Sequence, residues 1–392
     1  GPMVALGCKY LRICHLNNCA TGVATQDEKL RREHFTGLPE MVMNYFKFIA
    51  EETRELMAEL GVTQLTDLSG RTDLLEALPG LTARQAKLDL SGILASPVAP
   101  AGSSLFSQQH NPTFDKGPLN LKMVEDLLEA VENMSGGEFR YDIRNTDRSV
   151  GARLSGEIVK RHGNQGMAAD PVKVHFNGTA GQSFGVWNAG GLEMILTGDA
   201  NDYVGKGMTG GKLVVKPHVG VAFKSHEAAI IGNTCLYGAT GGKLYAAGTA
   251  GERFAVRNSG ALAVVEGIGD NGCEYMTGGI VTVLGTTGVN FAAGMTGGFA
   301  YVLDECGNFA KRTNPELVEL LDVADLAIHQ EHLRGIITAH LNETGSSRAE
   351  EILANFDSYV PKFRLIKPKS SDVKSLLGHT SRSSAELRIQ AQ

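Results

Sequence analysis

The stretch Met276-Thr-Gly-Gly-Ile-Val-Thr-Val-Leu-Gly285 consists of a glycine pair, a short apolar run and a closing glycine. Similar stretches recur along the chain, and the separations between their starting pairs are 20, 31, 18, 19 and 19 residues. The starting pairs are Gly190-Gly191, Gly210-Gly211, Gly241-Gly242, Ser259-Gly260, Gly278-Gly279 and Gly297-Gly298. A repeat near 19 residues is shorter than the helical repeats and lacks a leucine-rich signature. It predicts a β-solenoid in which each repeat forms one turn.

The apolar runs after these pairs are the expected strands. They are Leu192–Leu196, Lys212–Val215, Lys243–Ala247, Ala261–Val265, Ile280–Leu284 and Phe299–Leu303. Stacked turns lie about 4.8 Å apart, so glycine is needed where a side chain would meet the next turn and where φ is positive. The single 31-residue interval predicts a loop inserted around Lys216-Pro-His-Val-Gly220. We therefore expect a parallel β-helix.

Composition narrows the class of protein. The chain has 392 residues and 48 glycines, 29 of which lie between Gly178 and Gly307. Collagen needs glycine at every third position, and a flexible linker would lack the many Val, Leu and Ile residues of this region. The net charge of −6 argues against general nucleic-acid binding. No apolar run is long enough to span a membrane and no signal peptide is visible, so we expect a soluble, cytoplasmic protein.

The flanks of the repeats are expected to be mainly helical. Proline at a first helical position predicts a helix from Pro39 to the residue before Gly61, and Asn314-Pro315-Glu316 predicts another helix start. Further helices are expected at 72–78, 82–94, 119–132, 150–161, 323–341 and 348–356, with a strand at 138–143. The predicted domains are residues 1–95, a linker at 96–118, an α/β adaptor at 119–175, the β-helix at 176–312 and C-terminal helices at 313–392.

Three of the six cysteines, Cys8, Cys14 and Cys19, fall within twelve residues. An odd number argues against disulfides, and zinc would need a fourth ligand that the loop does not offer. Three thiolates on a short loop are able to hold an iron–sulfur cluster, because the sulfides of the cluster bridge its irons. Free reactive or structural thiols are the alternative. The other cysteines, Cys235, Cys273 and Cys306, are interpreted as buried small side chains.

Other motifs predict structure rather than chemistry. Two glycine fingerprints, at 205–210 and 267–272, lead into strands or further repeats instead of a helix, so they are predicted to be solenoid turns rather than nucleotide sites. The polar residues Asp199, Asn201, Asp202 and Lys206 fit a turn. The i, i+3 pair His329 and His332 is interpreted as an exposed helix face.

Residues 362–392 carry a local charge of +5. Such a charge is expected on a solvated helical face or on a docking surface for an acidic partner.

The chain resembles the C-terminal part of the large subunit of bacterial, NADPH-dependent glutamate synthases. The resemblance rests on Met3–Gln26, which holds the cysteine loop, and it extends over essentially the whole chain. The other matching segments are Gly70–Leu75, Arg144–Ser149, Gly178–Trp187 and Gly198–Gly207 with the repeats that follow.

This resemblance implies that Cys8, Cys14 and Cys19 hold a [3Fe-4S] cluster beside FMN in a (β/α)8 barrel. It implies that electrons from NADPH reach the cluster through a small subunit carrying FAD and [4Fe-4S] clusters, and that reduced FMN converts 2-iminoglutarate to glutamate. The ammonia would come from glutamine through an N-terminal amidotransferase domain. The last domain of the family is a right-handed β-helix with a spacer role.

The resemblance also implies that residues 1–95 are the end of the FMN barrel and that most FMN contacts lie upstream. We expect these 392 residues to be catalytically inactive by themselves and to hold the cluster poorly. Two alternatives remain. One is a β-solenoid scaffold that binds partners and whose cysteines are incidental. The other is a β-helix subunit of a formylmethanofuran dehydrogenase, which should lack the cysteine loop.

Overall fold

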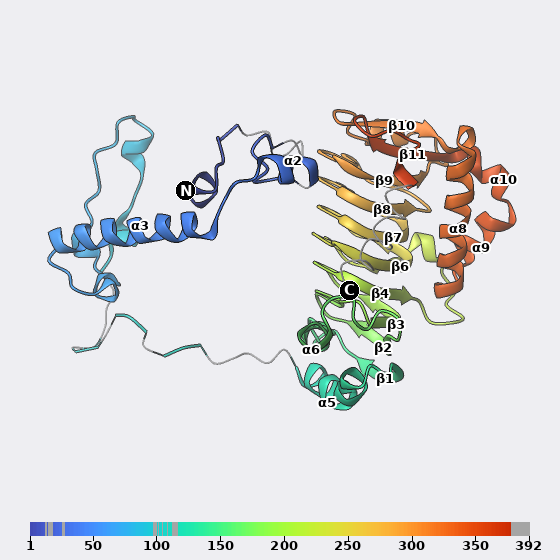
Figure 1. Ribbon diagram of the computed structural model, residues 1–392, viewed down its shortest axis with the longest axis horizontal. Helices are drawn as coiled ribbons and strands as arrows, with labels where there is room; N and C mark the ends of the chain where they lie inside the picture. Colours follow the sequence, from blue (N-terminus) through green and yellow to red (C-terminus); the bar gives the residue numbers. More distant parts are fainter. Residues whose placement is uncertain are drawn as a thin grey trace. The chain divides into compact units, whose positions relative to one another are not determined.

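The computed structural model describes residues 1–11, 14, 19–25, 28–96, 100, 102–103, 105–107, 109–111 and 117–377 (Figure 1). The chain divides into two compact units. The N-terminal unit comprises Gly1–Arg12 and Cys19–Phe114, and the solenoid unit comprises Asp115–Gln392 together with Ile13–Asn18.

A parallel sheet winds through the solenoid unit as a β-helix (Figure 1). Its rungs pair in the order β1-β2-β3-β4-β6-β7-β8-β9, with the short β5 beside β3 and β6. The parallel strands are β1 Gly137–Ile143, β2 Val172–Ala180, β3 Leu192–Ala200, β4 Thr209–Lys216, β5 Ala229–Ile231, β6 Gly241–Ala250, β7 Ser259–Gly267, β8 Thr277–Val283 and β9 Gly297–Leu303. The strands expected after the glycine pairs are confirmed. The extra residues between β4 and β6 form the predicted insertion, which contains β5 and the short helix η5 Ser225–Glu227.

The glycine pairs mark the start of the strands. A Cβ atom on Gly278 would lie 2.2 Å from the carbonyl oxygen of Ser259 on the preceding turn, so no side chain fits there. Gly260 has the same relation to Thr240, with a distance of 2.1 Å. The repeating pair of that turn is therefore Gly260-Ala261, one residue later than the Ser259-Gly260 pair read from the sequence.

Between the strands, alternate residues take the left-handed backbone conformation. Each of six turns contains three of them, and thirteen of these eighteen residues are not glycine. They are 183, 185 and 187; 203, 205 and 207; 234, 236 and 238; 253, 255 and 257; 271, 273 and 275; and 290, 292 and 294.

Amide groups of these residues point alternately to the two neighbouring turns. Gly205 donates a hydrogen bond to the carbonyl of Phe184 on the preceding turn, whereas Gly207 donates to Tyr237 on the following turn, both at 2.9 Å. A second hydrogen-bonded ladder thus joins the turns opposite the sheet. It satisfies amides that an irregular turn would otherwise leave unpaired.

The two ends of the solenoid are closed differently. Helices α5 Pro118–Glu132 and α6 Ala152–His162 pack on each other, and their buried residues join the core of the first rungs. At the other end, β11 Phe363–Pro368 pairs antiparallel with β9, and β10 Val318–Asp322 pairs antiparallel with β11.

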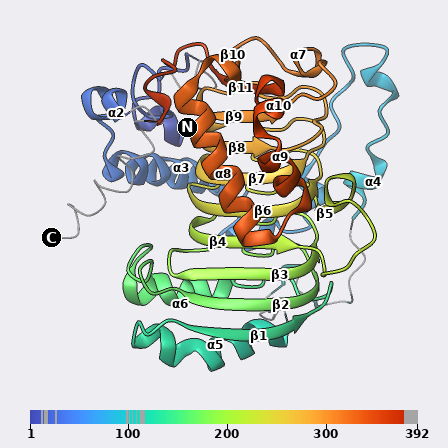
Figure 2. The same cartoon turned by 90° about the vertical axis from the view of Figure 1, so that its right-hand side faces the viewer.

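Helices also cover one outer face of the sheet (Figure 2). They are α8 Ala327–Thr344, α9 Ser347–Ala354 and the short α10 Phe356–Tyr359, with the single 3-10 turns η6 Val323–Asp325 and η7 Val360–Lys362. Alternation along each strand divides the apolar side chains between two cores. In β9, Ala300 and Val302 face the solenoid interior, while Phe299 and Tyr301 face α8. Because successive side chains of a strand point to opposite faces of the sheet, each strand contributes to both cores.

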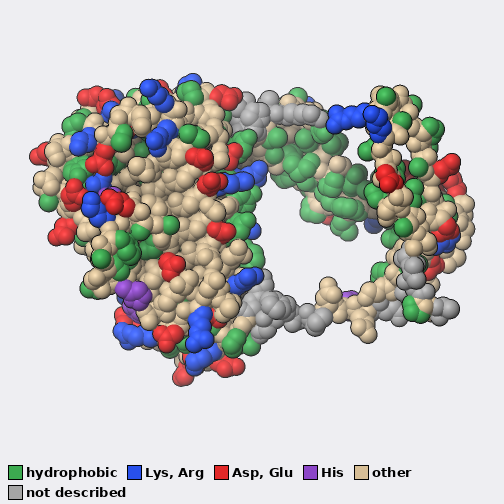
Figure 3. Space-filling model, turned by 180° about the vertical axis from the view of Figure 1, so that it is seen from behind, with side chains coloured by type: hydrophobic (Ala, Val, Ile, Leu, Met, Phe, Trp, Pro, Cys, Tyr) green, Lys and Arg blue, Asp and Glu red, His purple; other side chains and the backbone are tan. Residues whose placement is uncertain are grey.

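The N-terminal unit lacks such a core. Its longest element is α3 Pro39–Glu59, which begins at the expected proline and ends before Gly61. The shorter helices are α1 Pro2–Ala5, α2 Glu28–His34, η2 Leu65–Leu68, η3 Thr72–Leu74, η4 Gln85–Lys87 and α4 Ser91–Leu94. No apolar side chain of this unit is buried in the part of the chain that the structure describes. Apolar side chains lie instead on its surface (Figure 3).

Several helix predictions are wrong or too long. Asn314-Pro315-Glu316 leads into strand β10 rather than a helix, although α7 Phe309–Arg312 precedes it. The helices expected at 72–78 and 82–94 are reduced to single turns. The other flanking helices are confirmed within a few residues. Among the described residues, no helix is long and apolar enough to cross a membrane.

Candidate functional site

Cys8 follows the short helix α1 and is tied to it through its backbone. The Cys8 amide donates to the Met3 carbonyl at 3.0 Å, and the Tyr10 amide donates to the Cys8 sulfur at 3.4 Å. The chain reverses here through positive φ angles at Gly7 and Tyr10. Cys8 is half-buried. A backbone donor already faces its sulfur.

Cys19 opens a tight turn that collects donors around its sulfur. The Thr21 hydroxyl lies 3.4 Å from Sγ, and the Gly22 amide donates to the Cys19 carbonyl at 2.9 Å. The Thr21 hydroxyl and the amides of Ala24, Thr21 and Val23 lower the pKa of the Cys19 thiol to about 7, against a smaller effect of burial. Cys19 is therefore more readily deprotonated near neutral pH than an ordinary cysteine, and thiolate is the form that binds metal.

Cys14 is exposed, and its flanking residues 12–13 and 15–18 lie outside the described part of the chain. Cys8 and Cys19 belong to the N-terminal unit, whereas Ile13–Asn18 belongs to the solenoid unit. No group of three or more His, Cys, Asp or Glu side chains that could hold a metal ion occurs among the described residues. The joint ligand set of Cys8, Cys14 and Cys19 thus stays a prediction.

The scattered cysteines differ among themselves. Cys235 and Cys273 are fully buried in the solenoid, and burial raises the pKa of both thiols, that of Cys235 to about 12. They are the inert core residues that were expected. Cys306 is exposed, so the prediction of burial is wrong for this residue.

The glycine fingerprints are confirmed as solenoid segments. Residues 205–210 run from a left-handed turn into β4, and residues 267–272 run from β7 into the next turn. Neither leads into a helix. The polar turn is likewise occupied by its own contacts: Asp199 accepts from Thr179 at 2.7 Å, Asp202 accepts from the Asn233 amide at 2.7 Å, and the Lys206 ammonium lies over the Tyr203 ring.

The interpretation of His329 and His332 as an exposed helix face is wrong. His329 is buried and His332 half-buried on the first turns of α8, and both contact the buried Tyr301. The i, i+3 spacing of the two histidines does not show whether their face of the helix meets the sheet or the solvent. The one available signal was Tyr301 in β9, whose hydroxyl needs a partner once it is buried.

The basic C-terminal segment is not a free helical face where the structure describes it. Residues 363–368 form β11, in which Arg364 pairs with Asp322 and Lys367 with Glu319 of β10. Lys369 donates to the carbonyls of Pro315 and Glu316. Residues 378–392 lie outside the described residues.

Two known families match this chain, one over the solenoid and the other over the N-terminal segment that contains the cysteine loop. The family described as the GXGXG motif matches residues 120–369, and the family described as the conserved region in glutamate synthase matches residues 1–63. The first match covers the solenoid with its alternating left-handed turns. The second contains all three clustered cysteines.

The chain belongs to the GXGXG family and corresponds to the C-terminal region of the glutamate synthase large subunit. It is 46% identical to ferredoxin-dependent glutamate synthase 2 of Synechocystis over 97% of this chain and 24% of that protein. It is 45% identical to the chloroplastic ferredoxin-dependent enzyme of Spinacia oleracea over 94% of this chain and 23% of the relative. The large chain of the NADPH glutamate synthase of Bacillus subtilis is 44% identical over 94% of this chain and 24% of that protein.

The chain thus spans about a quarter of the length of these glutamate synthases. The names of these relatives include both ferredoxin and NADPH, and the chain is nearly equally identical to both kinds, so sequence identity does not separate the two electron donors. The match of residues 1–63 separates the family from a β-helix without the cysteine loop, such as the dehydrogenase subunit considered above.

Proposed function

We propose that this chain supplies the iron–sulfur loop and the structural β-helix of a glutamate synthase that makes glutamate from glutamine and 2-oxoglutarate. The observation that carries the proposal is the match of residues 1–63 to the conserved glutamate synthase region, since that segment holds Cys8, Cys14 and Cys19. The proposed group is a [3Fe-4S] cluster. When bound, it supplies one-electron transfer to a neighbouring flavin.

The donor chemistry of the loop fits such a cluster. The pKa of Cys19 is lowered to about 7, so this thiol is deprotonated at little cost when iron binds. The Tyr10 amide donates to the Cys8 sulfur, and amides near Cys19 favour its thiolate. Hydrogen bonds to the sulfurs are one of the means by which a protein sets the potential of a cluster. Cys8, Cys14 and Cys19 would be the ligands.

The surface of the N-terminal unit supports its proposed place in a larger FMN barrel. Phe48 of α3 is 72% exposed and Phe46 is 55% exposed, and no residue of α3 is buried. Apolar side chains at this density are costly in water and normally meet other protein. We assign this contact to upstream domains of the same subunit, which would also hold most of the FMN contacts. The NADPH-dependent small subunit with FAD and [4Fe-4S] clusters is the proposed electron source.

The solenoid unit is assigned a structural role, and the 392 residues are proposed to be inactive alone. The polar turns and glycine motifs of the solenoid unit are engaged in internal contacts, as described above. The scaffold hypothesis, in which the cysteines are incidental, makes a different prediction about iron.

Anaerobic reconstitution of the 392-residue protein with iron and sulfide tests the proposal. Up to about three irons per chain, with the EPR signal of an oxidised three-iron cluster, would support the proposal; partial occupancy is expected because the upstream domains are absent, and no iron under any condition would leave the scaffold hypothesis. Cys14→Ser should abolish the signal, and Cys306→Ser, the matched exposed cysteine of the solenoid unit, should retain it. An iron content that Cys14→Ser leaves unchanged would favour the scaffold hypothesis.

A further inference from the structure

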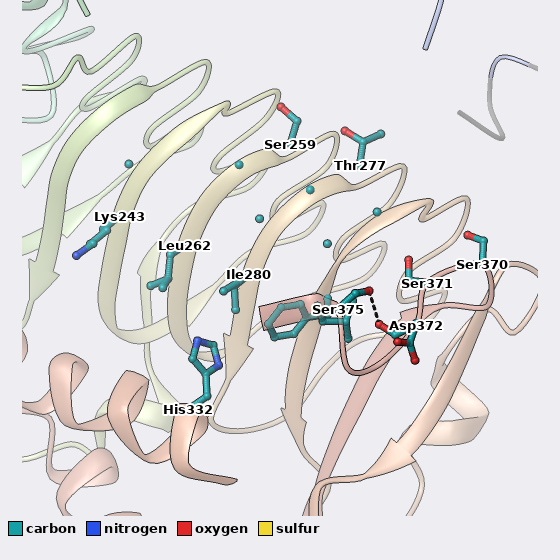
Figure 4. Close-up of a pocket in the computed structure, with 18 residues that line it drawn as sticks. Lys243, Ser259, Leu262, Thr277, Ile280, His332, Ser370, Ser371, Asp372 and Ser375 are labelled. Carbon is teal, nitrogen blue, oxygen red and sulfur yellow. Dashed lines mark hydrogen bonds between the residues drawn. The ribbon is translucent and has the colours of Figure 1, made fainter. Parts of the chain in front are cut away.

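The left-handed turns opposite the sheet carry two columns of residues on their outer side. Equivalent residues of successive turns lie in register, as Leu262 and Ile280 do on the strands (Figure 4). The Trp187 amide, for example, donates to the Lys206 carbonyl on the following turn at 2.9 Å. One column consists of residues 183, 203, 234, 253, 271 and 290, and the other of residues 187, 207, 238, 257, 275 and 294. We call these two columns, together with Lys206 and Tyr237, the turn face.

Two aromatic side chains of the turn face are exposed. Trp187, the only tryptophan of the chain, is 62% exposed, and Tyr275 is 41% exposed. A Cβ atom on Gly207 would lie 2.9 Å from Cδ1 of Trp187, and one on Gly294 would lie 2.4 Å from Cε1 of Tyr275. Each ring thus lies against the glycine of the following turn and is held on the surface. Exposed Trp and Tyr side chains of this kind are enriched where proteins meet.

The turn face also carries N–H donors that have no acceptor. Arg253 and Arg257 are exposed, and neither guanidinium forms a hydrogen bond or an ion pair with any described residue. The indole N–H of Trp187 has no acceptor among the same residues. The Lys206 ammonium lies between two rings instead, 5.2 Å from the centroid of Tyr203 and 5.9 Å from that of Tyr237.

The carboxylates that border the turn face do not neutralise these arginines. Asp202 accepts from the Asn233 amide, and Asp270 accepts from the Val289 amide, both at 2.7 Å. Within the described part of the chain, neither Glu252 nor Glu274 forms an ion pair with the guanidinium groups. A surface that matches the turn face therefore has to bring carboxylates of its own, since Arg binds carboxylate with a paired set of N–H donors.

We propose that the turn face docks on the upstream part of the same large subunit, at a protein surface that receives the rings of Trp187 and Tyr275 and places carboxylates against Arg253 and Arg257. The proposal rests on the proposed function, which makes this chain one part of a longer subunit. Six turns at about 4.8 Å form a face roughly 24 Å long, which suits a contact between domains.

Two observations favour the upstream part of the subunit as the occupant. The chain spans only about a quarter of the length of its relatives, so most of the subunit lies outside it. A second copy of this chain would bring the same arginines to a two-fold interface and leave them facing like charges.

Hydroxyl-radical footprinting read by mass spectrometry tests this contact by comparing the intact large subunit with the 392-residue protein. We expect Trp187 and Tyr275 to be oxidised several-fold more slowly in the intact subunit, because an interface core excludes water. Phe223, which is 51% exposed on the insertion, is the control and should react at the same rate in both proteins. Equal rates at Trp187 would overturn the proposal. Protection of Trp187 that increases with the concentration of the 392-residue protein would also overturn it, because a second copy would then be the occupant.

A charge reversal tests the predicted carboxylates. In the intact subunit, Arg257→Glu should raise the oxidation rate of Trp187 toward that of the 392-residue protein. Lys243→Glu reverses an exposed charge on strand β6, outside the turn face, and should keep Trp187 protected (Figure 4). Full protection of Trp187 in the Arg257→Glu subunit, or equal exposure in both variants, would overturn the proposal.

The melting temperature of the 392-residue protein provides the folding control, and neither substitution should change it. The result is separate from the iron measurement, which reports on the cysteine loop. Failure of the cluster to form leaves the protection of Trp187 unchanged, and an unprotected Trp187 leaves the iron content unchanged.

Discussion

At the scale of single residues, Cys19 shows how a short turn lowers the pKa of a thiol. The hydroxyl of Thr21 is the largest cause of its lowered pKa. Thr21→Val keeps the side-chain shape and removes the hydroxyl, so we expect the pKa of Cys19 to rise from about 7. The rate of alkylation at Cys19, followed by mass spectrometry against pH, should move to higher pH. Cys306 provides the internal control, and an unchanged Cys19 profile would contradict the role of Thr21.

The left-handed turns make a second prediction about single residues. Gly238 has φ of +63°, and a Cβ atom there would meet nothing within 4 Å. Gly238→Ala therefore isolates the conformational cost and should lower the free energy of unfolding by about 1–2 kcal/mol.

Gly156 is the matched control for that substitution. It lies inside α6, and a Cβ atom there also meets nothing within 4 Å. Gly156→Ala should raise the free energy of unfolding by about 0.5–1 kcal/mol. Urea unfolding of both variants measures the pair, and equal effects of the same sign would refute the assignment of strain to the turn.

The sequence could show that glycine is frequent here but not that thirteen other residues share the strained conformation. Residue types such as Leu236 and Arg257 do not indicate a positive φ, although both residues adopt one. Their conformation follows from the hydrogen bonds between turns, which exist only in the folded stack. The cysteine loop is the reverse case. Its residue types predicted thiolate chemistry, but whether the three sulfurs come together depends on contacts that the spacing of the cysteines does not reveal.

At the scale of elements, a buried polar cluster fastens α8 and α9 to the sheet. Nε2 of His340 lies 3.3 Å from Oε1 of Glu266, and both side chains are fully buried. The Ser346 hydroxyl donates to the same oxygen of Glu266 and also accepts from the Ala349 amide at the start of α9. Removing one partner would leave Glu266 buried without its histidine.

We therefore expect His340→Leu to lower the free energy of unfolding by about 3–5 kcal/mol. The double variant Glu266→Leu, His340→Leu should recover much of this loss, because an apolar pair then replaces the buried carboxyl group and its imidazole partner together. Thermal or urea unfolding compares the two. A double variant less stable than His340→Leu would show that the pair itself stabilises the interface.

Glu266 also gives a pH dependence with a definite sign. Burial acts to raise its pKa, but the hydrogen bonds from His340 and Ser346, together with the nearby Ser225 hydroxyl, outweigh burial, and the pKa is lower than usual. A carboxyl with a lowered folded pKa contributes stability above its unfolded pKa, and this contribution disappears as pH falls through the folded value. Glu266→Gln should flatten this acid-side loss. Unfolding free energies of both proteins between about pH 3 and 6 would show it.

The elements with strong local periodicity were predictable. The six strands after the glycine pairs and the helix from Pro39 are confirmed, because spacing and a proline cap specify them locally. The strands β10 and β11 were not foreseen. Residues 363–368 pair with β9 on one side and with β10 on the other, where Arg364 and Lys367 meet Asp322 and Glu319. That is a property of the assembled end of the sheet.

At the scale of the whole molecule, the two units differ in their capacity to fold alone. The solenoid unit has two extended apolar cores, and the described part of the N-terminal unit buries no apolar side chain. Removing residues 1–95 should leave the melting temperature of the solenoid within a few degrees, because neither core loses a residue. Calorimetry of the shortened chain measures this.

Residues 1–95 alone should give no cooperative unfolding transition, since hydrophobic burial is the main driving force of folding. Amide hydrogen exchange of the intact protein offers a second view. Protection should be high in β2–β9 and low in α3. Strong protection in α3 would show that the N-terminal unit has a stable core of its own.

The antiparallel strands at the end of the solenoid have a consequence for self-association. A parallel stack ends in a row of free amides and carbonyls that would accept a strand from another molecule and grow into a fibre. Here β11 reverses direction on β9, and the outermost strand β10 is only five residues long and bears charged side chains at Glu319 and Asp322. At the opposite end, α5 and α6 pack against the first rungs. At the β9 end of the solenoid, the repeat therefore cannot grow by adding one more parallel rung.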